Sequence, residues 1–243
     1  DFMLYAMDAV VNQAAKWSYM FGGQSHPGLT IRAIINRGGE QGAQHSQALH
    51  AWFSHVPGLR VVMPSSVADA RNLLIASVLC NDPVMYIDDR WLYDQEDDLP
   101  PVTELDLTTQ KPEITIFGSD ITIIASGHSS LLAREAATLL KSENISVEVI
   151  DVRVLNPFNI EGIIKSVKKT ENFLVIDSGW VSGGFSAEII AKVVERLPVD
   201  CLNNPPVRIA LPDAPAPTSR VLEDVYYTSI NDVINEVRKI IKK

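Results

Sequence analysis

The fold class is decided by residues 120–155, DITIIASGHSSLLAREAATLLKSENISVEVIDVRVL. The run from Ile121 to Ala125 is apolar, a glycine turn follows, and apolar residues then recur at helical spacing from Leu131 to Lys141. A second apolar run extends from Val147 to Leu155. Apolar runs without alternation are typical of strands in a parallel sheet that is covered on both faces. The stretch therefore predicts a strand–helix–strand unit of an α/β domain.

The same alternation continues on both sides of this unit. Downstream it predicts a helix over 160–169, a strand over 173–176, a helix over 186–197, a strand over 207–211 and a basic helix over 230–241. Upstream it predicts a helix over 3–21, strands over 29–35, 59–63 and 84–87, and helices that end at residues 53 and 79. Residues 113–243 are thus expected to form a complete doubly wound domain. Residues 1–93 lack an opening strand and begin in mid-pattern, so we expect the first domain to be incomplete at its N-terminus, as in a fragment or a processed product.

Residues 94–112 separate the two predicted domains. Five acidic residues and no basic residue occupy positions 94–104, and Pro100, Pro101 and Pro112 interrupt the segment. Charge together with proline is typical of a solvated linker. We therefore interpret the segment as a connector, and much of the chain's acidity as belonging to it.

Composition excludes several classes of function. The formal net charge of −9 argues against nucleic-acid binding, which depends on neutralising phosphates with Lys and Arg. No apolar run approaches the roughly 20 residues that a membrane-spanning helix needs. Two cysteines are too few for a disulfide framework and have no zinc-site spacing, so a reducing compartment is the default expectation.

Three short motifs have ordinary structural interpretations. The glycines of residues 38–42 are spaced GGxxG rather than GxGxxG, which favours a flexible loop over a dinucleotide site. Gly183–Gly184 could place an anion at the N-terminus of the next helix or could allow close helix–sheet packing. Residues 127–130, GHSS, lack the second glycine of a hydrolase elbow. Ser129 or Ser130 is therefore expected to cap the next helix.

The best local candidate for chemistry is His45, in the run RGGEQGAQHSQALHAWF at residues 37–53. A glycine-rich loop delivers Gln44-His45-Ser46-Gln47 to the start of a short helix. An imidazole held between two amides is suited to proton transfer or to orienting an anionic substrate. Of the other histidines, His26 and His50 are predicted to be exposed or structural.

Nearly the whole chain resembles one enzyme family. The motifs that carry the resemblance are Asp1-Phe2-Met3, Val11-Asn12-Gln13-Ala14-Ala15-Lys16, Gly42-Ala43-Gln44-His45-Ser46-Gln47, Ala51-Trp52-Phe53, His55, Pro57-Gly58, Pro64-Ser65, Asp69-Ala70-Arg71, Val149-Ile150-Asp151-Val152-Arg153, Gly179-Trp180 and Ala187-Glu188-Ile189. They are similar to those of the β subunit of 2-oxo acid dehydrogenase E1 components, the thiamin-diphosphate enzymes of the transketolase superfamily. Ala9 departs from that pattern, since a Gln is usual there.

The resemblance implies a fold and a division of labour. Residues 1–93 would be a truncated thiamin-diphosphate pyrimidine-binding domain, and residues 113–243 a transketolase C-terminal domain. Phe2 would pack on the aminopyrimidine ring of thiamin diphosphate, and His45 would be the active-site histidine near the lipoyl entrance. A potassium site built mostly from carbonyl oxygens would map to Leu29, Ser77, Val78, Cys80 and Asp82.

The remaining parts of the active site would lie outside this chain. An E1 α subunit would hold Mg²⁺ and the diphosphate, and the glutamate that activates the cofactor would precede Asp1. The implied reaction is oxidative decarboxylation of a 2-oxo acid, pyruvate being the favoured one, with acyl transfer to the lipoyl group of the E2 acyltransferase. The implied partners are the E1 α subunit, a second β subunit and E2, without nucleic acid or membrane. The isolated chain is expected to be inactive.

Two alternatives remain open on sequence grounds. The first is another enzyme of the superfamily, such as a transketolase or a deoxyxylulose-phosphate synthase, although the QHSQ segment favours E1. The second is a non-catalytic scaffold that only dimerises and docks a partner. The expected compartment is the bacterial cytoplasm or the mitochondrial matrix.

Overall fold

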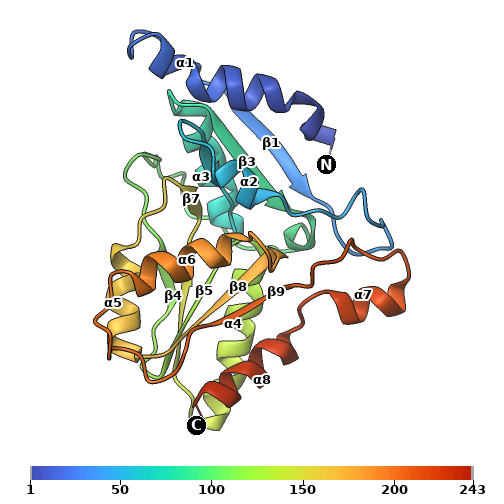
Figure 1. The fold of residues 1–243 in the computed structure, drawn as a ribbon, viewed down its shortest axis with the longest axis vertical. Coiled ribbons are helices and arrows are strands. Elements are labelled where there is room, and N and C mark those ends of the chain that lie inside the picture. The colour runs from blue at the N-terminus through green and yellow to red at the C-terminus, as the bar shows by residue number, and fades with distance from the viewer. Residues whose placement is uncertain (1, 242–243) are drawn as a thin grey trace.

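The structure is a computed structural model that describes residues 2–241 and, for Phe2, the backbone alone. Two α/β layers lie end to end, with the N-terminal helices at one end and the C-terminus at the other (Figure 1). The first half contains η1 (Phe2–Ala6), η2 (Asp8–Ala14), α1 (Ala15–Met20), β1 (Thr30–Ile35), α2 (His50–Ser54), β2 (Arg60–Val62), α3 (Val67–Leu79), β3 (Val84–Asp89) and η3 (Arg90–Leu92).

The second half contains the remaining elements. These are β4 (Glu113–Ile116), β5 (Ile121–Ala125), α4 (His128–Leu140), η4 (Lys141–Glu143), β6 (Val147–Asp151), β7 (Val154–Asn156), α5 (Glu161–Thr170), β8 (Phe173–Trp180), α6 (Phe185–Val194), β9 (Val207–Leu211), α7 (Arg220–Tyr226) and α8 (Ile230–Ile241). Strand β4, helix α7 and the 3-10 helix η3 were not predicted. Every other element overlaps a predicted one, with the helical run at the N-terminus changing from 3-10 through π to α geometry.

The second sheet confirms the doubly wound prediction. Its order is β4-β6-β5-β8-β9, parallel except for β4. Side chains of successive residues alternate between its two faces, as the strand period of two requires. Ile123 packs with α4 and α8 on one face, whereas the adjacent Ile124 packs with α5 and α6 on the other. Burial on both faces explains why its strands are mostly apolar and do not alternate with polar residues.

The first sheet has the order β1-β3-β2-β7. Strands β1, β3 and β2 are parallel, and β7 joins β2 in antiparallel orientation. Val84 and Tyr86 face α3, whereas Met85 and Ile87 face the side of η2 and α2. The buried residues around Met85 and Ile87 are continuous with those on the α5–α6 face of the second sheet. One hydrophobic core therefore runs through both halves.

The prediction of a single strand over 147–155 is wrong, because the structure has two strands there, β6 and β7. Arg153 has a left-handed φ of 58°, which ends the β geometry between the two strands. Arg153 also donates to Asp69 of α3 at 3.2 Å, so the bend is held by the first half. After this bend β7 crosses to the first sheet. The two halves therefore share a strand that local sequence pattern does not reveal.

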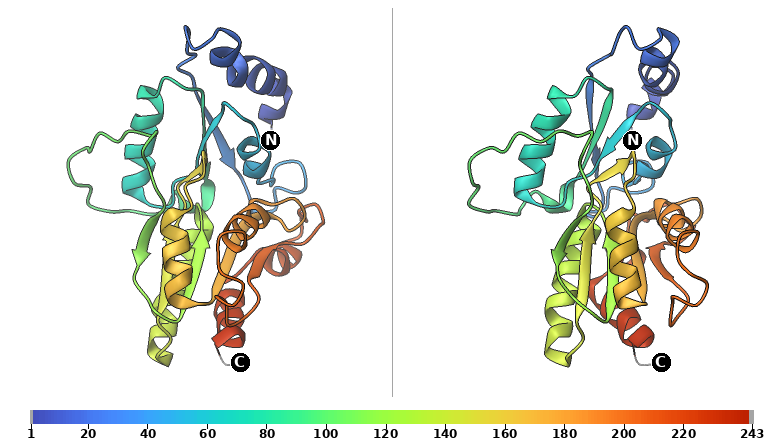
Figure 2. Two further views of the ribbon diagram at one scale, coloured as in Figure 1. Left: turned by 60° about the vertical axis from the view of Figure 1, so that its left-hand side comes forward. Right: turned by 90° about the vertical axis from the view of Figure 1, so that its left-hand side faces the viewer.

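Residues 93–112 contain no helix or strand and run outside α3 (Figure 2). Most of this segment is exposed, but Leu107 is buried against Val62 and Leu73 of the first half. The predicted connector is therefore attached to the first half by Leu107 and the partly buried Leu105, rather than solvated along its whole length.

The capping role predicted for Ser129 or Ser130 is wrong, since α4 begins earlier, at His128. The residue before it is Gly127, whose φ of 55° favours glycine. Ser129 instead contacts Ser178 at 3.0 Å, and Ser130 donates to Asp151 at 3.0 Å. Both hydroxyls tie α4 to the ends of neighbouring strands. Among residues 2–241, no helix is long and apolar enough to cross a membrane.

Candidate functional site

Residues 36–49 form an irregular segment between β1 and α2, at the junction of the two halves (Figure 1). His45 is half-buried within it, and the His45 N–H donates to the Gly42 carbonyl at 3.3 Å. Ser46 is buried. The segment leaves β1 at its carboxyl end, which is where ligand sites of open α/β sheets form.

The start of this segment is fixed by a buried ion pair. Arg37 pairs with Asp89 at the end of β3, and both side chains are almost fully buried. The guanidinium also lies 4.7 Å from the centre of the Trp91 ring, a cation–π contact. A Cβ on Gly38, whose φ is 74°, would lie 2.5 Å from the Trp91 indole nitrogen. Glycine at position 38 is therefore required by this packing, which agrees with the predicted positive-φ loop.

His128 packs on the other side of Trp91. The two rings meet edge to face at 4.9 Å. Burial and the nearby charge of Arg37 lower the pKa of His128 to about 3. The imidazole is therefore neutral near pH 7 and is a structural part of the Trp91 cluster.

The middle of the segment is bound to the second domain through Glu40. The Glu40 N–H donates to both carboxylate oxygens of Glu223 on α7, each at 3.1 Å. In return the Arg220 N–H donates to the Glu40 carboxylate at 3.3 Å. A Cβ on Gly42 would lie 2.6 Å from the Thr218 methyl group, so the loop and the stretch before α7 are in direct contact. Helix α7 thus holds the loop ahead of His45.

The end of the segment is bound to the second domain through His50. Its Nε2 lies 2.8 Å from the Asp177 carboxylate, and both side chains are at least 97% buried. Burial raises the pKa of Asp177, but His50 and the backbone N–H groups of Gly179 and Ser186 outweigh it and lower the pKa to about 2. Asp177 is therefore a carboxylate, so His50 Nε2 must be the donor.

The position of Asp177 explains why two glycines, Gly183 and Gly184, precede α6. Ser186 lies in the first turn of α6, and its N–H donates to Asp177 at 2.8 Å. A Cβ on Gly184 would lie 2.3 Å from the Trp180 carbonyl oxygen. Both sequence interpretations thus hold: packing is close, and the helix N-terminus does meet an anion, which is the chain's own Asp177.

The beginning of the chain lies beside this segment. The Phe2 side chain, predicted to stack on the cofactor, lies outside what the structure describes. The next residues, Met3 and Leu4, line a cavity of about 30 Å³ together with Gln47 and His50. Its walls are otherwise apolar, as a flat heteroaromatic ring would require, but its volume suits a water molecule rather than a pyrimidine ring.

The five residues predicted to form a potassium site gather at the opposite end of β1 from His45. Leu29 precedes β1, Ser77 and Val78 end α3, and Cys80 and Asp82 lie before β3. The carbonyl oxygens of Leu29 and Ser77 accept from Val84 and Cys80, at 2.8 and 3.3 Å, and each retains a second lone pair.

The last turn of a helix also leaves carbonyl oxygens without helical partners, a donor set that suits a monovalent cation. The Asp82 carboxylate accepts a hydrogen bond from Arg60 Nε at 2.8 Å. Across the described part of the chain, no group of three or more His, Cys, Asp or Glu side chains could hold a metal ion.

A larger groove of about 720 Å³ runs past α2. It is lined by η2, α2 and α6, with Trp52, His55, Phe158 and Lys192 among its side chains. Several aromatic side chains near the N-terminus are also strongly exposed, namely Tyr5, Tyr19, Phe21 and Trp52. Aromatic side chains are enriched at subunit interfaces relative to the rest of a protein surface.

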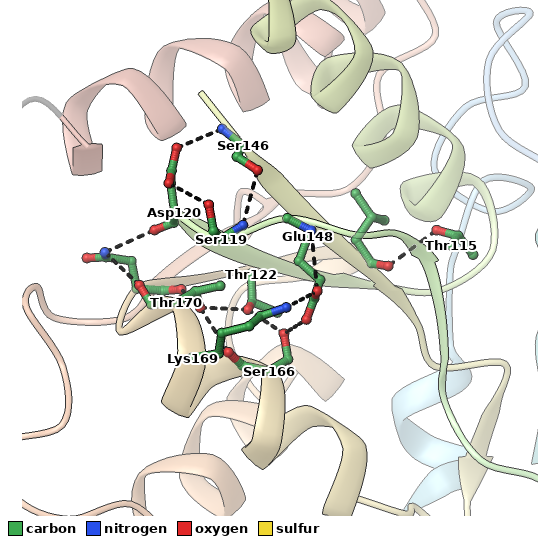
Figure 3. Close-up of polar contacts among 12 residues, drawn as sticks. Thr115, Ser119, Asp120, Thr122, Ser146, Glu148, Ser166, Lys169 and Thr170 are labelled. Atoms are coloured by element: carbon green, nitrogen blue, oxygen red, sulfur yellow. Dashed lines mark hydrogen bonds and ion pairs between the residues drawn. The ribbon is translucent and has the colours of Figure 1, made fainter. Parts of the chain in front are cut away.

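A buried polar cluster around Glu148 in the second domain has a structural role (Figure 3). Buried Glu148 on β6 pairs with Lys169 and accepts from Ser166, and Ser166 contacts Thr122 at 2.6 Å. Thr122 in turn lies 2.8 Å from Thr170. These groups satisfy one another beneath α5, so the cluster attaches that helix to the sheet.

Sequence reasoning missed the His50–Asp177 pair. The sequence predicted that His50 is either exposed or structural. His50 is buried and structural, so the first alternative is wrong. The one available signal was a histidine on the apolar side of a short helix, 127 positions from its partner. Nothing local could have connected the two.

Comparisons with known proteins point in one direction. Residues 1–95 match the model for the transketolase pyrimidine binding domain, and residues 111–233 match that for the transketolase C-terminal domain. The chain is 34% identical over its whole length to the pyruvate dehydrogenase E1 component subunit beta of Rhizobium meliloti, and it spans 53% of that relative. It is 35% identical to subunit beta of the acetoin:2,6-dichlorophenolindophenol oxidoreductase of Bacillus subtilis, covering 97% of the chain and 68% of the relative.

A mitochondrial protein and a solved structure extend the comparison. The mitochondrial pyruvate dehydrogenase E1 component subunit beta of Bos taurus is 34% identical over 98% of the chain and 67% of the relative. A split gene transketolase, described as an inactive beta4 tetramer, superposes with a TM-score of 0.73 over 98% of the chain and 74% of that structure. Its sequence identity is 21%, so it supports the fold alone.

Proposed function

Since this chain belongs to the transketolase-related family of 2-oxo acid dehydrogenase E1 β subunits, we propose that it is the β part of a thiamin-diphosphate-dependent E1 enzyme. The observation that supports this most directly is the placement of the Gln44–Gln47 segment. It lies at the carboxyl end of a parallel sheet, at the junction of two domains. The first domain holds its start through Arg37 and Asp89, and the second domain holds it through Glu223 and Asp177. The proposed reaction is oxidative decarboxylation of a 2-oxo acid, pyruvate being favoured, followed by acyl transfer to lipoyl-E2.

His45 is the proposed catalytic residue. An imidazole carries both a donor and an acceptor nitrogen, so the half-buried His45 beside Gln44 and Gln47 has the groups that proton transfer requires. Its proposed task is to orient the lipoyl dithiolane and to shuttle a proton as the acyl group is transferred. The other histidine near the segment, His50, is occupied by Asp177.

Thiamin diphosphate would supply the electron sink for decarboxylation. In this proposal Phe2 packs on the aminopyrimidine ring, beside the wall formed by Met3 and Leu4. The small volume of the cavity there indicates that the ring would be bound against this wall at a subunit boundary rather than inside the chain. The E1 α subunit would hold Mg²⁺ and the diphosphate, and K⁺ would bind the carbonyl oxygens near Ser77 and Cys80.

The proposed assembly contains two α and two β subunits and docks to E2. The exposed aromatics beside η2 and α2 support a subunit contact on that face. The proposed compartment is the bacterial cytoplasm or the mitochondrial matrix, because the relatives include bacterial and mitochondrial proteins.

The test separates decarboxylation from acyl transfer. The β polypeptide is combined with an E1 α subunit, and two rates are measured with pyruvate. One is reduction of an artificial dye, and the other is acylation of an isolated lipoyl domain. His45→Gln should lower lipoyl acylation by about 100-fold or more and change dye reduction much less.

A matched control is His26→Gln, which alters an exposed histidine at the other end of β1. It should leave both rates unchanged. Equal loss of both rates in His45→Gln would contradict the acyl-transfer role. Turnover of pyruvate by the 243-residue chain alone, with thiamin diphosphate and Mg²⁺, would contradict the two-subunit site.

A further inference from the structure

We propose that Asp177 of the second domain, acting through His50, is a positioning residue for His45. The inference deepens the proposed function and rests on it for the role of His45. Its structural content is separate: a carboxylate far away in the sequence fixes where the Gln44–Gln47 segment lies.

The hydrogen bonds show which residue is the anchor. Asp177 accepts from Gly179 N at 2.9 Å and from Ser186 N at 2.8 Å. Both donors belong to the backbone of the second domain, at the end of β8 and the start of α6. The carboxylate is therefore held in place whether or not His50 is present. His50, the first residue of α2, adds the third hydrogen bond and is thereby tied to this fixed point.

The packing around the pair leaves little freedom. A Cβ on Gly179 would lie 3.3 Å from His50 Cε1 and 3.4 Å from the Ala48 carbonyl oxygen. The backbone of β8 therefore lies directly against the residues that join His45 to α2. Phe185 closes the other side, with its ring 6.4 Å from the His50 ring and nearly perpendicular to it. A shift of α6 or of the end of β8 must move this part of the segment.

The second domain also holds the segment upstream of His45, through Glu40 and Glu223. His45 thus lies between two attachment points, five residues from each. Because both attachments are to the same domain, they define the segment's position jointly. Both attachments contain a carboxylate, but both members of the His50–Asp177 pair are buried, whereas Glu40 is exposed. Breaking the His50–Asp177 pair should therefore have the larger effect.

An alternative role for His50 is acid–base chemistry of its own. Its Nδ1 is buried and has no hydrogen-bond partner among the described residues. Replacement by Gln distinguishes the two roles, because the Gln amide can reach Asp177 with an N–H donor but cannot titrate. Positioning predicts that His50→Gln preserves the position of His45, and acid–base chemistry predicts that it does not restore activity.

The experiment observes His45 directly, in the full chain and without cofactor. Histidine is labelled with ¹³C at Cε1, and the His45 signal is assigned by its absence in His45→Gln. His50→Leu and Asp177→Asn should shift the His45 signal. In Asp177→Asn both carboxylate oxygens already accept N–H groups, so the new amide NH₂ must face a donor and one contact is lost. His50→Gln should leave the His45 signal near its original position.

Thr122→Val is the matched control, since Thr122 is a fully buried polar residue of the second domain that contacts Ser166 and Thr170, not the segment. It should destabilise the chain without moving the His45 signal. An unchanged His45 signal in folded His50→Leu and Asp177→Asn overturns the proposal. A shift in His50→Gln as large as that in His50→Leu also overturns it. If Asp177→Asn does not fold, the comparison of His50→Leu with His50→Gln decides alone.

The activity arm keeps this proposal distinct from the proposed function. In the reconstituted assembly, His50→Leu should lower lipoyl acylation by about 10- to 100-fold, the cost of misplacing a catalytic group by a fraction of an ångström to an ångström. His50→Gln should recover most of that loss. If the His45→Gln enzyme acylates the lipoyl domain at the normal rate, the proposed catalytic role of His45 is wrong. The shifts of the His45 signal in His50→Leu and Asp177→Asn would still show whether Asp177 and His50 position the segment.

Discussion

Raising the pH from about 4.5 to about 8 should destabilise this chain through Asp151, a carboxyl group buried where the two halves meet. Asp151 ends β6, and only 1% of it is exposed. It accepts hydrogen bonds from Ser65 of the first half and from Ser130 of α4. Arg134 donates to Ser65 at 2.9 Å rather than to Asp151 itself. The carboxyl is thus hydrogen-bonded but has no cation in direct contact among the described residues.

The sign follows from the direction of the shift. Burial raises the pKa of Asp151 from 3.8 to about 6, against the opposing effect of its hydroxyl donors. The folded state therefore holds the proton more tightly than the unfolded state does. Stability from this group is fully present below about pH 4 and is lost as the pH rises through about 6. A difference of about 2 pKa units corresponds to about 3 kcal/mol in total, of which about 2 kcal/mol falls between pH 4.5 and 8.

Urea unfolding followed by tryptophan fluorescence, repeated across this pH range, measures the effect. Asp151→Asn carries no titrating group, so the free energy of unfolding of the variant relative to the original chain should rise by about 2 kcal/mol from pH 4.5 to 8. Ser130→Ala should move the transition to higher pH, because its hydroxyl favours the ionised form. A difference between Asp151→Asn and the original chain that does not vary with pH would refute the reasoning.

Two further predictions concern stability. Gly58→Ala would place a Cβ 1.9 Å from the Ala15 carbonyl oxygen at a φ of 89°, so urea unfolding should show a loss of about 3 kcal/mol or more; a loss below about 1 kcal/mol would show that the backbone can relax. Thr122→Val keeps the shape of a buried side chain but removes the hydroxyl that contacts Ser166 and Thr170, and should cost about 1–3 kcal/mol. The exposed Thr138→Val serves as its control and should change stability by less than about 0.5 kcal/mol, and equal effects at the two positions would contradict the importance of burial.

Helices and strands were predictable where one local period dominated. The strand at Ile121–Ala125 and the helix at Ile230–Ile241 were both found, because each carries its own pattern of apolar residues. The short helix α7 was missed, since seven residues with Glu223 as the buried member carry too weak a period. Strand β4 was missed because it follows the acidic linker and pairs only at the sheet edge.

The candidate site was only partly predictable. His45 was predicted from its glycine-rich surroundings and from the resemblance of the QHSQ motif, both of which are local, and its role stays a proposal. Its supports were not identified, because Asp177 and Glu223 lie more than 120 residues away and become neighbours of the segment only in the folded chain. An ordinary sequence period contains no information about such contacts.

The sequence by itself determined the fold class and the family, and it predicted His45 as the candidate for chemistry. Buried strands and amphipathic helices impose their periods on the chain, and a motif of consecutive polar residues is visible without coordinates. Two features are visible only in the tertiary structure. The chain bends at Arg153 so that β7 pairs with β2 of the first sheet, and the Asp177 carboxylate of the second domain holds the His45 segment through His50. These two features depend on pairing between groups that are distant in the sequence. A carboxylate or a strand edge that is buried needs a hydrogen-bond partner, and the packing of the whole chain determines which partner is within reach.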